Sequence, residues 1–378
     1  MGRWYGALEE LVMKGVVDPQ FWSGKKVFLT GHTGFKGGWL TVWLYSMGAK
    51  VSGYALAPST KPNLFEEVRV SGLCDHSYIG DVRDLASLRQ AMNQANPDIV
   101  IHMAAQPLVR YSYDNPVETY ATNVMGTVHL LEAVRTCPSV RAAVIVTTDK
   151  CYENKEWVWG YRENEPMGGH DPYSNSKGCA ELVTAAYRKS FFSEANYSSH
   201  RVAIASARAG NVIGGGDWST DRLIPDAIAA FEKKIPLIVR NPLAIRPWQH
   251  VLEPLSGYLV LAQSLYDQGV TFNGAWNFGP QDADARTVEE VITLFIDKWN
   301  QYIGGGPSWQ RDHQLQPYEA HLLKLDCSKV NHYLNWKAKW SLEAAVDAIV
   351  QWHQAFQNKE DLQVLMHKQI KMYCTSSR

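Results

Sequence analysis

Short apolar runs alternate with longer amphipathic stretches through the first half of the chain. Apolar residues at three- and four-residue steps predict helical stretches, and uninterrupted apolar runs predict buried strands. The expected strands are 26–30, 50–54, a segment ending at Ile79, 98–103, 142–147 and 202–207, and the expected helices reach Met47 and span 117–135 and 173–192. Continuous apolar strands that alternate with helices are typical of a parallel sheet covered on both faces. The pattern therefore predicts the α/β class, with a doubly wound parallel sheet of the Rossmann type.

The pattern becomes less regular after Gly210, where prolines and aromatic residues separate short elements. We expect residues 24–210 to form the Rossmann domain and residues 211–374 to form mainly a smaller, mixed α/β lobe beside it. Some later segments are expected to return to the sheet, so the boundary is not a single cut. Residues 1–23 precede the first strand and are expected to be an N-terminal extension without recognisable chemistry.

Composition and charge narrow the classes of protein that fit this pattern. The chain has 378 residues, of which 46% are hydrophobic, and this is ample for a sizeable core. Its formal net charge of -1 provides no broad basic field for nucleic acid or acidic lipid. No apolar run is long enough to span a bilayer, and Glu9, Glu10 and Lys14 interrupt the apolar stretch that a signal peptide needs. A small-molecule ligand fits better than a nucleic acid or a membrane.

The cysteines are scattered along the chain. None forms a Cys-x-x-Cys pair or a His/Cys cluster with zinc spacing, so the sequence predicts no metal site. We interpret them as reduced, mostly structural thiols of a cytoplasmic protein. They are Cys74, Cys137, Cys151, Cys179, Cys327 and Cys374.

A glycine-rich turn follows the first expected strand and opens the next helix. Gly31, Gly34 and Gly37 stand three residues apart within it. The first glycine permits a tight turn, the second lets the backbone approach a pyrophosphate, and the third allows close packing of helix and strand. An ordinary glycine-containing loop is the alternative, but the position within the first β–α–β unit favours a nucleotide site. The other candidate cofactor contacts in this turn are Thr33, Phe35 and Lys36.

The end of the second expected strand does not decide which dinucleotide binds. Residues 51–56 offer no acid for an adenosine ribose and no arginine for a 2′-phosphate, so NAD and NADP both remain open. Asp81 and Val82, after the third strand, are candidates to contact the adenine amino group. The alternative for Asp81 is a helix N-cap, a position for which Asp84 competes.

Tyr173 and Lys177 stand four residues apart, so on a helix they share one face. A lysine cation beside a phenol stabilises the phenolate and lowers the pKa of the tyrosine. Such a tyrosine can take the proton from an alcohol while a hydride leaves its carbon. By itself this spacing is most often a solvated helical face, but its position after the glycine turn and the fifth strand favours the catalytic interpretation.

Polar residues end the fifth expected strand at Thr147, Thr148, Asp149 and Lys150. The carboxyl ends of parallel strands face the ligand crevice, so these side chains are expected at a site rather than in the core. A helix cap or a turn is the alternative. Asp149 could act as a general acid and Lys150 as a base or charge partner. A plain dehydrogenase needs no such pair beside its hydride site, so the pair suggests a second proton transfer, such as elimination of water.

These motifs resemble those of the extended short-chain dehydrogenases/reductases. The matching pieces are the glycine turn, Ala104-Ala105-Gln106, Asn123-Val124-Met125-Gly126-Thr127, Thr148-Asp149, Tyr173-x-x-x-Lys177 and Arg208-x-x-Asn211. More narrowly, the chain resembles the nucleotide-sugar 4,6-dehydratases, and among them those that act on CDP-glucose. The distinctive pieces are residues 18–22, 31–39, 147–152 and 246–251. The resemblance covers nearly the whole chain after about residue 17.

Lys150 departs from the pattern of the wider family. Other hexose dehydratases usually have glutamate at this position, whereas those that act on CDP-glucose share the lysine. Dehydratases that act on UDP-acetylhexosamines can also carry Thr-Asp-Lys, so the trio alone does not fix the substrate. Whether Lys150 itself removes a proton is left open.

The resemblance implies NAD as the cofactor and dehydration of CDP-D-glucose to CDP-4-keto-6-deoxy-D-glucose, a step of deoxysugar biosynthesis. Tyr173 would deprotonate the C4 hydroxyl during oxidation, with Thr148 bound to the C4 oxygen and Lys177 supporting the tyrosine and the nicotinamide ribose. Lys150 would assist removal of the C5 proton, and Asp149 would protonate the departing C6 hydroxyl before hydride returns to C6.

Ligand contacts and assembly are also implied by the resemblance. Contacts to NAD would come from the glycine turn, Asp81, Val82, Ala104, Ala105, Gln106, Asn123, Thr147, Tyr173 and Lys177. Contacts to the nucleotide sugar would come from Gln106, Asn211, Arg222 and Arg246, with surface ion pairs as the alternative for the two arginines. A homodimer, or a dimer of dimers, through helices 117–135 and 173–192 is the family-based expectation.

Three other functions remain open at this point, and the first is a 4,6-dehydratase that acts on another nucleotide sugar. An epimerase needs Tyr173 and Lys177 but not the pair of Asp149 and Lys150. A non-catalytic NAD-binding sensor would keep the fold without the chemistry, and the intact set of Thr148, Tyr173 and Lys177 argues against it.

Overall fold

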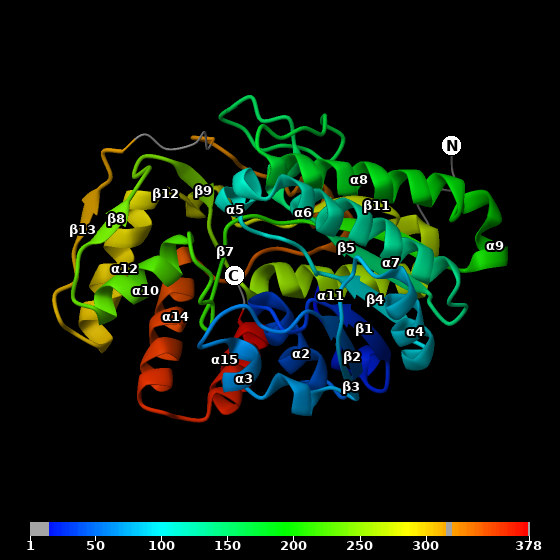
Figure 1. Cartoon of the computed structure of the whole chain (residues 1–378), viewed down its shortest axis with the longest axis horizontal. Helices are drawn as coiled ribbons and strands as arrows, with labels where there is room; N and C mark the ends of the chain where they lie inside the picture. Colours follow the sequence, from blue (N-terminus) through cyan, green and yellow to red (C-terminus); the bar gives the residue numbers. More distant parts are fainter. Residues whose placement is uncertain (1–14, 315–319, 377–378) are drawn as a thin grey trace.

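The computed structural model describes residues 15–314 and 320–376, and Figure 1 shows the arrangement of its elements. Parallel strands form a seven-stranded central sheet in the order β11-β6-β5-β4-β1-β2-β3. Their bounds are β1 Lys26–Thr30, β2 Lys50–Ala55, β3 His76–Ile79, β4 Ile99–His102, β5 Ala142–Val146, β6 Ala203–Arg208 and β11 Gly274–Asn277. Each strand expected in the first half is present with closely similar bounds, so the predicted doubly wound parallel sheet is confirmed.

Helices cover both faces of the sheet. Since successive residues of a strand point to opposite sides, each strand contributes side chains to the core on either face. In β1, Val27 and Leu29 belong to one hydrophobic core, together with residues of α2, α11 and α15. Phe28, between them, belongs to a second core with residues of α4, α7 and α8. These helices are α2 Phe35–Ser46, α4 Leu85–Ala95, α7 Gly126–Arg135, α8 Pro172–Ser190, α11 Leu252–Gln268 and α15 Leu362–Thr375. Burial of both strand faces accounts for the uninterrupted apolar runs of the sequence.

The stretch expected to be helical over 117–135 consists of three segments. α6 (Pro116–Tyr120) runs into a π-helical turn, η2 (Ala121–Met125), and α7 continues from Gly126. Turns of this kind are frequent at functional sites, because the wider turn changes the direction of the side chains that it carries. Here the turn carries Asn123, whose buried side chain binds the loop after β4.

The second half of the chain contributes a smaller lobe beside the sheet (Figure 1). In the described part of the chain it contains the paired strands β7–β10, β9–β12 and β8–β13. With helices α10, α12 and α14 these strands surround a third hydrophobic core. Their bounds are β7 Val212–Ile213, β8 Leu237–Val239, β9 Ile245–Pro247, β10 Gln249–His250, β12 Ala285–Thr287, β13 Trp309–Arg311, α10 Leu223–Glu232, α12 Val288–Tyr302 and α14 Leu342–Gln357. α11 and β11 lie between lobe elements in sequence, but they pack on and within the main sheet.

A short helix, α1 (Pro19–Trp22), precedes the sheet. Trp22 is buried, and its Nε1 donates to Gln263 Oε1 of α11 at 2.7 Å, so this segment packs on the sheet half. Residues 1–14 of the expected N-terminal extension lie outside the described residues. The remaining short helices are α3 Leu64–Glu67, α5 Val109–Asp114, α9 Tyr197–His200, α13 Ser328–Leu334, η1 Val70–Leu73, η3 Asp149–Cys151, η4 Glu194–Asn196, η5 Gly269–Phe272 and η6 Asp282–Asp284.

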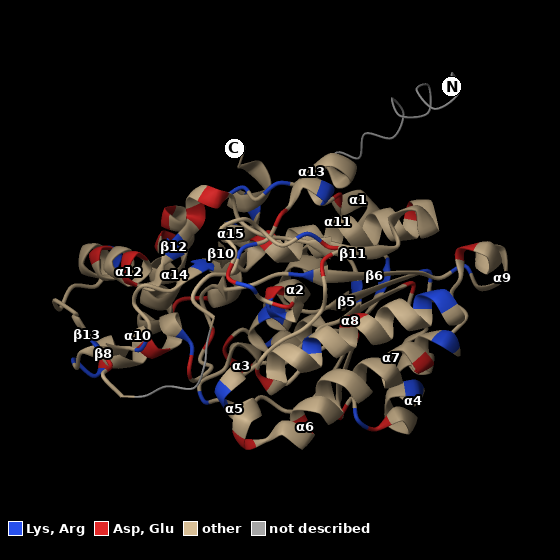
Figure 2. Cartoon of the chain, turned by 90° about the horizontal axis from the view of Figure 1, so that it is seen from above, with Lys and Arg blue, Asp and Glu red and all other residues tan. Residues whose placement is uncertain are grey.

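Charges of both signs are interspersed over the surface helices in the view of Figure 2. This distribution accompanies the formal net charge of -1. Among residues 15–314 and 320–376, no helix combines the length and the hydropathy that a bilayer span requires.

Candidate active site

The glycine turn follows β1 and begins α2. Gly31 has a φ of 82°, and its N–H donates to the Tyr54 carbonyl at 2.9 Å. A β-carbon on Gly37 would overlap the backbone of Gly31, so only glycine allows the helix to approach the turn this closely. Gly34 is the N-cap residue of α2, and no side chain caps this helix end. An open helix N-terminus favours a negatively charged group such as a pyrophosphate.

The side chains of Thr33 and Lys36 bind other parts of the protein. Thr33 Oγ1 donates to the Leu56 carbonyl at 2.8 Å, which fixes the loop after β2. Lys36 Nζ donates to the hydroxyl of Tyr258 on α11 at 3.1 Å and lies over the same ring. Burial, assisted by the nearby Lys177 cation, lowers the pKa of Lys36 to about 7. Lys36 can therefore hold or release a proton near neutral pH.

The imidazole ring of His32 packs against the backbone of β2 at Gly53. A β-carbon on Gly53 would overlap the imidazole ring of His32. His32 Nε2 lies 2.7 Å from Ser77 Oγ on β3, and burial lowers the pKa of His32 to about 4. The imidazole is neutral near pH 7, so it supplies no charge that would distinguish a ribose from a phosphate.

Asp81, which follows β3, is bound to Arg83. Its Oδ2 accepts from Arg83 Nε at 2.8 Å and from an Arg83 terminal nitrogen at 2.6 Å, and these bonds hold the pKa of Asp81 below its usual range. Asp84 is the residue that caps α4, so the N-cap alternative for Asp81 is wrong. Contact of Asp81 and Val82 with an adenine stays a prediction.

Asn123 joins the loop after β4 to α8. Its Oδ1 accepts from Gln106 N at 2.8 Å, and its Nδ2 donates to the Gln106 carbonyl at 3.0 Å and to Ser176 Oγ at 2.9 Å. The Gln106 side chain in turn binds the backbone of Leu108, because its Nε2 donates to the Leu108 carbonyl and its Oε1 accepts from Leu108 N. Gln106 and Asn123 thus shape the loop that follows residues 104–105, and direct contact of the Gln106 side chain with a substrate stays a prediction.

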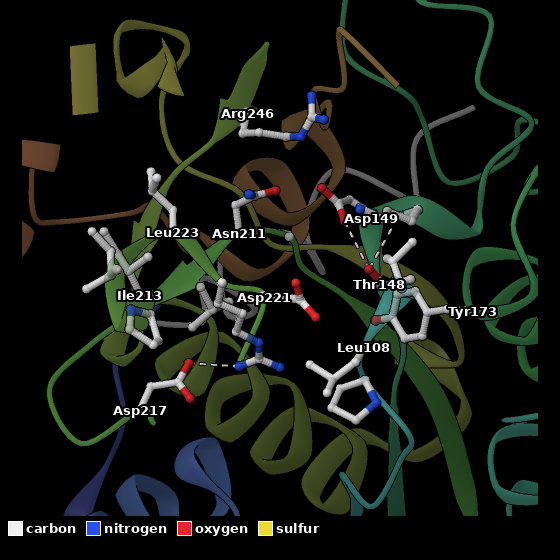
Figure 3. A pocket seen from close by; sticks show the side chains of 18 of the residues that line it. Leu108, Thr148, Asp149, Tyr173, Asn211, Ile213, Asp217, Asp221, Leu223 and Arg246 are labelled. Carbon is white, nitrogen blue, oxygen red and sulfur yellow. Dashed lines mark hydrogen bonds and ion pairs between the residues drawn. The ribbon is translucent and has the colours of Figure 1, made fainter. Parts of the chain in front are cut away.

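The turn after β5 brings the predicted trio together. Thr148 caps η3, because its Oγ1 accepts from Lys150 N at 3.3 Å, and it donates to Asp149 Oδ1 at 3.0 Å. Figure 3 shows the Thr148 hydroxyl between Asp149 and the ring of Tyr173. A hydroxyl, a carboxyl and a phenol therefore meet at the carboxyl end of strand β5.

Asp149 is 1% exposed, and burial raises the pKa of its carboxyl against the opposing effects of Lys150, Thr148 and Arg246. Within the described part of the chain its Oδ2 has no hydrogen-bond partner. The carboxyl lies against Gly210, where an added β-carbon would overlap it. A carboxyl that retains its proton more readily than usual is suited to act as a general acid.

Tyr173 and Lys177 lie on one face of the first turns of α8. Desolvation raises the pKa of Tyr173 to about 12, while a hydrogen bond with Thr148 and the Arg222 cation act in the opposite direction. Burial lowers the pKa of Lys177 to about 8, and its Nζ donates to the Val146 carbonyl at 3.3 Å. The net shift of Tyr173 is opposite to the lowered pKa that the Tyr-x-x-x-Lys spacing predicts, because desolvation outweighs the hydrogen bond with Thr148 and the Arg222 cation.

These side chains line one end of a cavity of about 350 Å³ between the sheet and the lobe. The lobe side of the cavity comes from residues 211–214, 237–241 and other segments that include Arg222 and Arg246. Lysine and arginine outnumber aspartate among the lining residues, by seven to four. This excess of positive charge suits a ligand with a diphosphate.

The three residues expected to contact the nucleotide sugar all line the cavity, but their side chains have different partners. Asn211 lies in the cavity wall, and Arg222 reaches the cavity while it pairs with Asp217 at 2.8 Å. Arg246 also lines the cavity, but its guanidinium donates to the backbone carbonyls of residues 320–321. Figure 3 shows this guanidinium directed away from the centre of the site. Contact of all three side chains with a nucleotide sugar stays a prediction.

Three further charged residues of the cavity were not expected from the sequence. Asp221 Oδ1 lies 3.2 Å from a terminal nitrogen of Arg110 on α5 and 3.6 Å from one of Arg240 after β8. Asp221 thus links the sheet half to the lobe beside the cavity. Because the three residues are far apart along the chain, no local pattern predicts them.

The fold and this site define a class of protein. The chain has the fold and site of a short-chain dehydrogenase/reductase of the extended type. Its site combines a glycine turn after β1, Thr148 at the end of β5, and Tyr173 and Lys177 on α8. The GDP-mannose 4,6 dehydratase family model matches residues 28–349, and the chain belongs to this family.

Named relatives support this membership. The chain is 57% identical over 362 residues to CDP-glucose 4,6-dehydratase of Salmonella typhimurium, and the match covers 96% of this chain and 99% of that protein. It is 26% identical over 341 residues to dTDP-glucose 4,6-dehydratase of Xanthomonas campestris, with coverage of 86% and 92%.

Solved structures show the same fold. The dTDP-glucose 4,6-dehydratase of Bacillus anthracis in complex with NAD aligns with a TM-score of 0.69 and 20% identity, and the alignment covers 89% of this chain and 99% of that one. The UDP-glucose 4-epimerase of Thermotoga maritima with UDP-glucose aligns with a TM-score of 0.73 and 18% identity, over 88% and 99%.

Proposed function

We propose that the protein is an NAD-dependent dehydratase that converts CDP-D-glucose into CDP-4-keto-6-deoxy-D-glucose, a step of deoxysugar biosynthesis. The observation that carries this proposal is the buried carboxyl of Asp149, which shares the Thr148 hydroxyl with the Tyr173 phenol. A second acid beside the tyrosine is required for loss of water and is not required for simple oxidation. The choice of CDP-glucose is supported by the 57% identity to the Salmonella typhimurium enzyme of that name.

The residues of the glycine turn fit NAD as the cofactor. Gly31 and Gly37 let the turn and the start of α2 pack directly against neighbouring backbone, and the N-terminus of α2 is open to a pyrophosphate. Lys177 and the loop at residues 104–106 lie at the carboxyl ends of the neighbouring strands, where the remainder of a dinucleotide would extend. When bound, NAD supplies a reversible acceptor of hydride.

Oxidation at C4 begins with a proton transfer to Tyr173. The Tyr173 phenolate accepts the proton of the C4 hydroxyl and becomes the phenol, and Thr148 holds the C4 oxygen by a hydrogen bond. The raised pKa of Tyr173 makes its phenolate a strong base once formed, and Arg222 and Thr148 favour that form. Lys177, on the same face of α8, stabilises the negative charge.

Loss of water then depends on the turn after β5. A ketone at C4 makes the adjacent C5 proton acidic, and Lys150 assists its removal. Asp149 donates a proton to the departing C6 hydroxyl, a role that its raised pKa favours. The two carbons are neighbours in the sugar, and Asp149 and Lys150 are neighbours in the chain, so one short turn can serve both.

The nucleotide diphosphate extends from the catalytic end of the cavity toward the lobe. Arg222 and Asn211 lie in that part of the wall, and Arg246 can reach it by exchanging its bonds to the carbonyls of residues 320–321. Bidentate guanidinium groups are well suited to phosphate oxygens.

Assembly and location belong to the same proposal. α6, η2 and α8 expose apolar side chains, among them Val117 at 82% and Leu182 at 59%, as a homodimer through these helices requires. The dimer, or a dimer of dimers, is proposed on this basis. Free thiols at all six cysteines support a cytoplasmic location.

Turnover with CDP-, dTDP-, GDP- and UDP-glucose tests the proposal, with detection of a 4-keto-6-deoxy sugar by NMR. CDP-glucose is expected to react fastest, and Tyr173→Phe serves as the inactive control. Release of a CDP-sugar inverted at C4, with no loss of water, would establish an epimerase instead. Absence of any 4-keto-6-deoxy product with all four sugars contradicts the dehydratase assignment.

A further inference from the structure

One face of α8 carries Tyr173, Lys177 and Glu181 at successive four-residue steps. The first two residues belong to the proposed catalytic set, and the third is not part of it. The Glu181 side chain is only 4% exposed. A buried carboxylate is costly unless it is paired and hydrogen-bonded, so its partners indicate what it holds in place.

Glu181 binds two strands of the sheet. Its Oε1 accepts from Thr147 Oγ1 at 2.5 Å, at the end of β5. Its Oε2 accepts from Ser206 Oγ at 2.6 Å and from a terminal nitrogen of Arg208 at 2.8 Å, both on β6. Burial acts to raise the pKa of Glu181, but Arg208 and the two hydroxyls outweigh it and hold the pKa below its usual range. Glu181 is therefore an anion that joins the catalytic helix to the strand ends.

Arg208 extends these hydrogen bonds to the other end of the turn at residues 148–151. Its second terminal nitrogen donates to the hydroxyl of Tyr152 at 2.7 Å, and this hydroxyl donates to Asn277 Oδ1 at 2.7 Å on β11. Glu181 thus holds Thr147, directly before the turn, and Arg208 holds Tyr152, directly after it. The residues between these anchors are 148–151, which include the proposed acid and base.

The charge of Glu181 also acts on Lys177. The groups that interact electrostatically with Lys177 are Glu181 on α8, Cys151 on η3, His102 on β4 and Lys36 on α2, and Tyr173 lies one turn away on the same face of α8. Burial lowers the pKa of Lys177 to about 8, and Glu181 is the strongest influence in the opposite direction. Burial raises the pKa of the Cys151 thiol and keeps it neutral, so Glu181 is the anion that favours a charged Lys177.

We propose that Glu181 is a positioning residue of the reaction, which with Arg208 fixes the turn at residues 148–151 against α8 and favours the ammonium form of Lys177. This inference rests on the proposed function, because it assigns Glu181 a part in the same site. Glu181 acts through Thr147, Arg208 and Lys177, and it does not itself touch a reacting atom.

Glu181→Gln keeps the shape of the side chain and removes its charge. We expect kcat to fall about tenfold or more with KM nearly unchanged, because the turn loses its alignment. We also expect the alkaline limb of the kcat profile to move to lower pH by about one unit, since Lys177 loses its anion. Glu181→Asp, which restores the charge, should return the limb toward its original position.

A matched control separates these effects from simple loss of stability. Glu253 is also fully buried and accepts from Lys339 N, Trp340 N and the Tyr373 hydroxyl, away from the cavity lining. Glu253→Gln should lower the melting temperature without moving the pH profile. If Glu181→Gln does not fold, the double variant Glu181→Gln with Arg208→Gln removes both charges and leaves no unpaired arginine. It should show the same pH shift.

A second readout needs no substrate. Carbon-13 NMR of lysine-labelled protein, assigned with Lys177→Arg, follows the titration of Lys177 directly, and its midpoint should be lower in Glu181→Gln. An unchanged midpoint, together with an unchanged alkaline limb in folded variants, overturns the inference. Failure of the proposed function is distinguishable, because the wild-type protein would then give no 4-keto-6-deoxy product while its NMR titration remained measurable.

Discussion

The carboxyl group of Asp149 lies directly against the backbone of Gly210, in space that an added β-carbon would occupy. Gly210 follows β6, the strand next to β5 in the sheet, so the position of the proposed acid depends on a residue of the neighbouring strand. The close approach also removes water from the carboxyl, and burial is the main reason that the pKa of Asp149 is raised.

Gly210→Ala should displace Asp149 and slow dehydration by about 100-fold, because a shift of roughly an ångström in a catalytic group has effects of this size. The rate of 4-keto-6-deoxy product formation measures it. Gly72→Ala is the matched control, since an added β-carbon there meets nothing within 4 Å. Full dehydration activity in Gly210→Ala would show that the position of the carboxyl is not important.

Replacement of the pair by Asp149→Asn and Lys150→Met should retain oxidation at C4 and lose elimination of water. Tyr173 remains in place for the first proton transfer, whereas the second has neither acid nor base. Accumulation of reduced nicotinamide, followed by absorbance, without 4-keto-6-deoxy product is the expected result.

The control for this variant is Glu153→Gln with Lys155→Met, which removes a half-exposed ion pair from the next loop. It should dehydrate at the wild-type rate. Unchanged dehydration in the Asp149/Lys150 variant itself would refute the roles assigned to both residues.

Arg222→Gln should lower kcat for C4 oxidation at neutral pH. The Arg222 cation lowers the pKa of Tyr173 against the dominant effect of desolvation, so its removal raises that pKa further. A smaller fraction of Tyr173 is then in the phenolate form at any given pH, and the rate at neutral pH falls. Arg110→Gln, which removes a cavity arginine paired with Asp221, should leave kcat at neutral pH nearly unchanged.

The protein should lose stability as the pH falls from about 6.5. Burial lowers the pKa of His102 and His250 to about 3 and that of His32 to about 4, so all three are neutral in the folded state at pH 5. The unfolded chain takes up protons at these residues below pH 6.5, which costs the folded state about 1.4 kcal/mol per pH unit for each fully buried histidine.

Melting temperatures between pH 7.5 and about 5 measure this dependence. His250→Gln should flatten the slope, and His76→Gln, at an exposed position on β3, should leave it unchanged. A wild-type melting temperature that does not fall over this range would contradict the prediction.

The strands of the sheet could be predicted from the sequence because each of the central ones is buried on both faces. Phe28 is buried on one face of β1 and its neighbours Val27 and Leu29 on the other, so the strand reads as a continuous apolar run without alternation. The stretch over 117–135 was correctly expected to be helical, but its π-helical turn was not, since no residue type marks such a turn.

The catalytic residues could be predicted where the motif is local. Tyr173 and Lys177 are one helical turn apart, and Asp149 and Lys150 are adjacent. Contacts between distant segments could not be predicted in the same way. The spacing of Asp149 and Gly210 in the sequence gives no sign that they touch.

The directions in which some side chains point also could not be predicted from the sequence. The guanidinium of Arg246 turns toward the carbonyls of residues 320–321, and the amide of Gln106 turns into its own loop. Both depend on which backbone groups lack partners nearby, and this is known only from the fold. Glu181 has a recognisable signal, because it continues the four-residue spacing of Tyr173 and Lys177.

The chain crosses repeatedly between the sheet and the lobe. After β6 it enters the lobe, returns through α11 and β11, enters the lobe again through α12, returns to the sheet half in α13, re-enters the lobe in α14 and ends on the sheet half in α15. Neither half is therefore a continuous stretch of sequence, so neither can be removed or exchanged as a single segment. A change of sugar or nucleotide preference has to arise by substitution within the cavity wall, and a fragment that ends near residue 210 would lack a strand and two covering helices of its own sheet.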